Sequence, residues 1–189
     1  KHEVMSKVWH GETEEDWAKV LIDVVINKGE KALVYCGIHH AFTEYKQPVA
    51  VNGKFIRFGD IRVGNAVFQK IGKRAFTIYL HAPWISADGY DKPDVRSADG
   101  YIDAVLSEVD PKYYRMGFDL QNTPFGKLQG ETSMYKFGYD HFRLETIYDG
   151  YICQGPLSAY VGVTPIKDFI NEHNLEEARL QSPNPRLRK

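Results

Sequence analysis

The chain has 189 residues, which fits one domain of ordinary size or one domain with a long insertion. Hydrophobic residues make up 43% and charged residues 26%, which excludes a disordered or fibrous chain. The 24 Lys and Arg residues balance 25 Asp and Glu residues, so the basic field that attracts nucleic acid is missing. The most apolar stretch, residues 20–26, is interrupted by Asp23 and is too short to span a membrane.

The two cysteines do not form the pattern of a disulfide framework, because Cys36 lies in an apolar run that we expect to be a buried strand. The cysteines therefore do not indicate the cellular compartment. The chain starts at Lys1 without an initiator Met, so we expect that sequence preceding it was processed, cleaved or left out.

The first half of the sequence predicts alternating helix and strand. Apolar residues recur at helical spacing over residues 13–28, with Thr13 as the expected N-cap and Gly29 as the stop. The continuous apolar run at residues 32–36 is typical of a central parallel strand covered on both faces. Residues 49–58, which contain Asn52-Gly53, predict a small hairpin.

The second half continues this alternation. A helix closed by Gly72 leads into a second strand, which predicts a strand, helix, strand unit. We therefore expect an α/β fold, with a mostly parallel sheet and flanking helices, as a single domain or half-domain over residues 1–181 and a flexible tail at 182–189. The expected elements are helices at 63–71, 98–109, 165–172 and 175–180, and strands at 75–80, 116–120 and 142–152.

Polar residues follow the first expected strand, where ligands bind in open α/β sheets. Gly37 allows a tight exit from the strand, and His39 and His40 come directly after it. In a helix, His40 and Glu44 would share one face at i, i+4, so Glu44 would hold the imidazole of His40 in one tautomer for use as a base or ligand. The equally weighted alternative is that both histidines are polar caps at a strand end.

Two further candidates follow later strands. His81 comes directly after the second strand. If that strand neighbours the first, His40 and His81 open onto one sheet edge and could bind a divalent metal, although no His-Glu-x-x-His signature is present. Asp119 would reach the same edge as a carboxylate for orientation or acid–base work, and its alternative role is that of a cap or turn residue. No Gly-x-Ser-x-Gly, Walker or Gly-x-Gly-x-x-Gly motif is present.

Five short motifs resemble those of the erythromycin esterase-like, ChaN-like and Tiki-like superfamily, in the same order. The best is the apolar strand that ends in Gly-Ile-His-His40, which is similar to the family's strand and Gly-x-x-His element. The segments that carry the resemblance are 1–6, 31–40, 63–78, 116–120 and 148–152.

The resemblance implies an α/β fold whose active site lies at the strand ends, where members use His and Glu for hydrolysis or bind metal or haem. It also implies that this chain is the C-terminal half of a larger domain, because nothing in it matches the earlier half that supplies a Glu and a His. Only His40 matches a functional position, with His39 beside it and Asp119 on a corresponding strand.

Three functions follow from these features. The first is hydrolysis of an ester or amide in a small-molecule or peptide substrate, with His40 as general base or metal ligand on a water. The second is a haem- or metal-binding protein of the ChaN-like type without turnover. The third is a non-enzymatic member, in which the loop aromatics form a partner surface.

Overall fold

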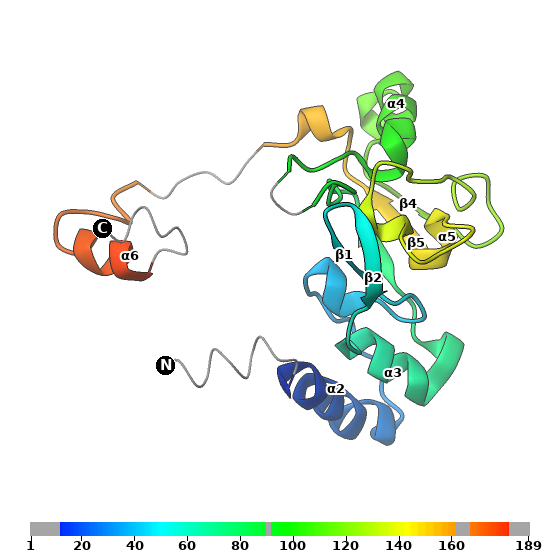
Figure 1. Ribbon diagram of the computed structural model, residues 1–189, viewed down its shortest axis with the longest axis horizontal. Helices are drawn as coiled ribbons and strands as arrows, with labels where there is room; N and C mark the ends of the chain where they lie inside the picture. The colour runs from blue at the N-terminus through cyan, green and yellow to red at the C-terminus, as the bar shows by residue number, and fades with distance from the viewer. Residues whose placement is uncertain (1–11, 90–91, 162–166, 182–189) are drawn as a thin grey trace. The chain divides into compact units, whose positions relative to one another are not determined.

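The computed structural model describes residues 12–89, 92–161 and 167–181 (Figure 1). The chain divides into two compact units, residues 1–158 and 159–189, and each is described by itself. The expected tail at 182–189 lies outside the described residues, so the expected boundary at 181 stays a prediction. Among the described residues, no helix is long and apolar enough to cross a membrane.

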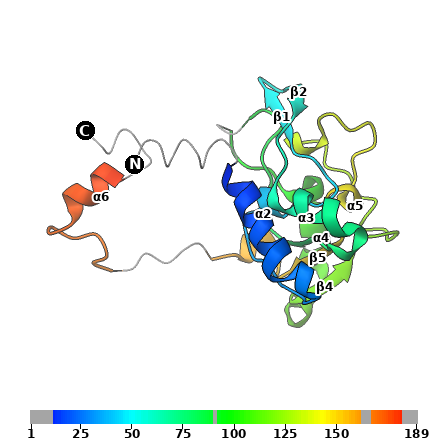
Figure 2. The ribbon, with the colours of Figure 1, turned by 90° about the horizontal axis from the view of Figure 1, so that it is seen from below.

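Two helices of the first unit, separated in the chain by the hairpin of residues 48–58, pack against each other. Helix α2 (Glu12–Val24) confirms the first predicted helix, but Thr13, the expected N-cap, lies inside it, and the helix ends before Gly29, which closes the 3₁₀ turn that follows with φ 74°. Helix α3 (Val63–Ile71) ends at Gly72, as the sequence predicts. Both views show α2 alongside α3 (Figures 1 and 2).

Two small sheets complete the unit. Strands β1 (Pro48–Val51) and β2 (Lys54–Phe58) form the predicted antiparallel hairpin, and its turn residues Asn52 and Gly53 both have positive φ. The second sheet has the order β3-β5-β4, with β3 parallel and β4 antiparallel to β5. Its strands are β3 (Ile78–Leu80), β4 (Met116–Asp119) and β5 (Gly150–Cys153).

The fold is therefore a mixture of helices and small sheets. Among the described strands, only β3 and β5 pair in parallel, so the expected mostly parallel sheet is not confirmed.

The apolar run at residues 32–36 is the clearest correction. It forms no strand, and Leu33 and Tyr35 are 93% and 86% exposed. No described strand pairs with it, and within the segment only Cys36 is partly buried. The prediction of a buried central strand is therefore wrong for this structure, because composition alone cannot supply the neighbours that such a strand needs.

The remaining elements differ from the predictions mainly in their ends. Helix α4 (Tyr101–Glu108) follows a 3₁₀ turn, and helix α5 (Leu144–Ile147) replaces the first part of the strand expected at 142–152. In the second unit, α6 (Leu175–Gln181) confirms the last predicted helix. Residues 167–172 form turns instead of a helix, and the rest of that predicted helix lies outside the described residues.

Aromatic side chains form much of the core of the first unit. Tyr79 from β3 stacks on Tyr148 with ring centres 4.4 Å apart, and Tyr151 from β5 stacks on Phe118 at 5.5 Å. Trp84 packs against the same cluster and is 1% exposed. Burial of such large rings provides much of the driving force for folding, so many aromatics in the loops act in packing.

Candidate functional site

A buried carboxylate in the first turn of α2 lies beside the histidine pair. Glu14 is 5% exposed, and its Oε1 lies 2.5 Å from Nδ1 of His40 and 3.0 Å from Nη1 of Arg62. Its Oε2 accepts a hydrogen bond of 3.0 Å from the backbone N–H of Val63, the first residue of α3. A helix N-terminus favours negative charge, so Arg62 and α3 together compensate the buried carboxylate.

The loop that carries His40 is tied to α3 by a single buried amide. Asn65 donates from Nδ2 to the carbonyls of Thr43 and Tyr45, at 2.7 and 2.8 Å. Its Oδ1 accepts from the backbone N–H of Arg62 at 2.9 Å, which caps the start of the helix. Asn65 therefore holds the loop that carries His40 next to Arg62, which contacts Glu14.

The His40 imidazole is only partly buried. The His40 side chain is 35% exposed, and its ring centre lies 5.5 Å from that of Trp17. The negative charge of Glu14 favours a proton on Nδ1, although this contact does not have the geometry of a hydrogen bond. Nε2 then keeps its lone pair and can accept a proton from a water or substrate.

His39 points to a different partner. Its Nε2 lies 2.9 Å from the hydroxyl of Tyr135, in a hydrogen bond, and its ring contacts Phe42. Burial, followed by the charges of Arg62 and His40, lowers the pKa of His39 to about 4. His39 is therefore neutral at pH 7 and anchors the 3₁₀ turn Ile38–Ala41 to the aromatic core.

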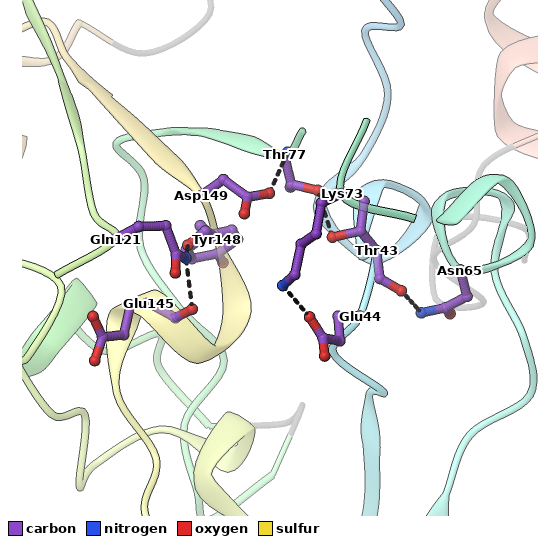
Figure 3. A network of polar contacts seen from close by, with 9 residues as sticks. All are labelled: Thr43, Glu44, Asn65, Lys73, Thr77, Gln121, Glu145, Tyr148 and Asp149. Atoms are coloured by element: carbon purple, nitrogen blue, oxygen red, sulfur yellow. Dashed lines mark hydrogen bonds and ion pairs between the residues drawn. The ribbon is translucent and has the colours of Figure 1, made fainter. Parts of the chain in front are cut away.

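Glu44 does not pair with His40 as the sequence predicted. The 3₁₀ turn ends at Ala41, so His40 and Glu44 do not share a helix face. Instead, Oε2 of Glu44 lies 2.5 Å from Nζ of Lys73 (Figure 3). Both side chains are exposed, and this ion pair is separate from the contact between Glu14 and His40.

His81 and Asp119 lie at opposite ends of the sheet, which corrects the expectation that they reach one edge. Asp119 pairs with Gly150, which is also the partner of Ile78, so Asp119 lies where β3 and β5 begin. His81 follows the other end of β3. The antiparallel direction of β4 causes this separation, because its carboxyl end meets the amino ends of the other two strands.

His81 belongs to a buried polar network. Its Nδ1 lies 2.8 Å from the hydroxyl of Tyr151, and its Nε2 lies 3.5 Å from Oδ2 of Asp103. Burial lowers the pKa of His81. Within the described ranges, no group of three His, Cys, Asp or Glu side chains could hold a metal ion, and the metal role of His40 and His81 stays a prediction.

Sequence reasoning missed Glu14 and Arg62. A signal for Glu14 was available, because Glu14 lies one turn before the small apolar residue Ala18, which α2 buries. An acid on the buried face of an amphipathic helix needs a partner. No comparable signal marked Arg62, because its role depends on where α3 begins relative to α2.

The site thus joins a histidine to a carboxylate that two other groups, Arg62 and the N–H of Val63, also contact, which is an arrangement suited to general acid–base chemistry. No protein-family model matches this chain, and neither a curated protein nor a solved structure matches it.

Proposed function

We propose that this protein is a hydrolase of an ester or amide bond, in which His40 activates a water molecule and Glu14 positions His40. The observation that carries the proposal is the 2.5 Å contact between Oε1 of Glu14 and Nδ1 of His40. A base that lies beside a carboxylate and is partly exposed to solvent is the arrangement that hydrolases use to deprotonate a nucleophile.

In the proposed reaction, Nε2 of His40 takes a proton from water while the water oxygen attacks the substrate carbonyl. The imidazolium that forms is stabilised by the Glu14 carboxylate. The proton then passes from Nε2 to the leaving alcohol or amine as the bond to carbon breaks. Glu14 keeps its position throughout, because Arg62 and the N–H of Val63 also bind it.

Two further points support a water nucleophile. Burial, followed by the negative charge of Glu14, raises the pKa of Cys36, so the nearby thiol is protonated and a poor nucleophile at neutral pH. The expectation from the sequence resemblance that His40 occupies a functional position also supports its proposed role. Small-molecule and peptide substrates are both consistent with a site that is open to solvent on one side.

The test is a panel of activated esters and anilides, assayed with the wild-type protein and three variants. We expect His40→Ala to lower hydrolysis of any positive substrate by about 100-fold or more, which is the usual contribution of a general base. His141→Ala is the matched control, because His141 is exposed and distant from Glu14 in the sequence. His39→Ala separates the two neighbouring histidines.

Retention of wild-type activity by His40→Ala would remove His40 from the mechanism. Equal losses in His39→Ala and His40→Ala would indicate that the loop, not the base, was damaged.

A further inference from the structure

A hollow separate from the contact between Glu14 and His40 lies between α3, the end of β2 and the loop that follows the His40 turn. It has a volume of about 440 Å³, which is within the range of small-molecule sites. Its apolar and aromatic wall consists of Phe58, Ile61 and Phe68. Neither Glu14 nor His40 lines the hollow. Its charged lining consists of two acids, Glu44 and Asp60, and one base, Lys46.

The walls of this hollow are held by hydrogen bonds that leave little room for collapse. The amide of Asn65 binds the loop backbone on one side. On the other side, the N–H of Gly59 donates to the carbonyl of Gln47 at 2.8 Å. The hydroxyl of Tyr139 exchanges two hydrogen bonds with the backbone of Lys46, at 2.8 and 2.9 Å. A preformed hollow lowers the ordering cost of binding.

An ammonium group of the chain itself lies at the edge of this hollow. Nζ of Lys73 is 2.5 Å from Oε2 of Glu44 and 5.7 Å from the ring centre of Phe68, and both of these partners line the hollow (Figure 3 shows Lys73 directed at Glu44). A carboxylate next to an aromatic face is the combination that recognises ammonium ligands. The Lys73 side chain is 77% exposed, so its pairing with Glu44 is weak and easily exchanged.

We propose that this hollow binds a small organic ammonium compound with an apolar body. The ligand ammonium replaces Nζ of Lys73 at Glu44, and its apolar part lies against Phe58, Ile61 and Phe68. Asp60 adds negative charge at the rim, and its only described ion pair, with Arg57, is long at 3.4 Å. Lys46 and Lys73 together balance the charges of Glu44 and Asp60, so the ligand ammonium binds only where Nζ of Lys73 leaves Glu44.

The test is a calorimetric or NMR titration of the full chain with benzylamine, which is charged at neutral pH, and with benzyl alcohol, its uncharged counterpart. We expect saturable binding of benzylamine that is at least tenfold tighter than that of benzyl alcohol. Glu44→Gln should weaken benzylamine binding by tenfold or more. Lys73→Met should strengthen it severalfold, because the competing ammonium is removed.

Glu108→Gln is the matched control, because Glu108 is an exposed acid on α4 and does not line the hollow. Since Glu44 and Lys73 are both exposed, their variants are expected to fold normally. The proposal is overturned if benzylamine does not bind saturably, if both probes bind equally, or if Glu44→Gln behaves as Glu108→Gln does.

Discussion

The carboxylate of Glu14 and the imidazole of His40 meet at 2.5 Å although they come from separate elements, the first turn of α2 and a 3₁₀ turn. The carboxylate is nearly enclosed, whereas about a third of the imidazole is exposed. The partner of His40 therefore comes from within this chain. The upstream half that the resemblance implies stays a separate prediction.

Replacing Glu14 with Gln should separate its roles in activity and stability. The imidazole loses its charged partner, so we expect hydrolysis to fall by about 100-fold. The free energy of unfolding should fall by about 1 to 3 kcal/mol, because Arg62 loses a charged acceptor. Denaturant unfolding and the ester assay measure the two effects. Glu15→Gln, an exposed neighbour on α2, is the control, and equal behaviour of both variants would contradict the role of Glu14.

His39 should make stability depend on pH. Its pKa is about 4 in the folded protein, below the ordinary 6.5, so the unfolded chain binds the proton more readily. The contribution of neutral His39 to the free energy of unfolding is therefore fully present above pH 6.5. It is lost progressively as the pH falls toward 4, by up to about 3 kcal/mol. His81 shifts in the same direction.

Urea unfolding of the wild type and of His39→Gln, between pH 7 and pH 4, measures this contribution. We expect a shallower pH dependence in the variant, and the exposed His141→Gln should follow the wild type. Parallel curves for the wild type and His39→Gln would show that His39 titrates normally.

Asn65→Ala should destabilise the protein by at least about 2 kcal/mol, because it leaves two carbonyls and one N–H without their partner. Thermal unfolding measures the loss. Gln69→Ala lies in the same helix but is exposed, so it should change stability little. A similar small effect of both variants would mean that the loop does not depend on Asn65.

Gly64→Ala should disturb the packing of α3 against the His40 loop. A Cβ at this position would lie 2.5 Å from the carbonyl oxygen of Phe42 and 2.8 Å from that of Ala41. Backbone atoms cannot rotate away as a side chain can, so we expect a loss of about 1 to 3 kcal/mol. Lys70→Ala on the exposed part of α3 is the control. Wild-type stability of Gly64→Ala would contradict this close approach.

Leu33→Ser tests the correction at residues 32–36. Because Leu33 is 93% exposed, the substitution should change the free energy of unfolding by less than about 0.5 kcal/mol. Leu120→Ala is the contrast, because Leu120 is fully buried and its truncation should cost about 2 to 5 kcal/mol. A loss of that size from Leu33→Ser would restore the prediction of a buried strand.

The sequence by itself determined the elements that depend on local chemistry. Asn52-Gly53 fixes the hairpin because both residues tolerate positive φ. The apolar spacing of residues 63–71 and the stop at Gly72 define α3, and Gly29 likewise ends the 3₁₀ turn that follows α2. The candidate status of His39 and His40 also came from their place after Gly37.

Only the tertiary structure decided which residues far apart in the sequence contact each other. Residues 32–36 have the composition of a buried strand but lie exposed, because burial depends on neighbours that a local pattern does not contain. The direction of β4 separates Asp119 from His81, and the packing of α2 against α3 gives Glu14, not Glu44, to His40. Contacts between residues far apart in the sequence form when elements pack, and local patterning fixes neither strand direction nor the angle between helices.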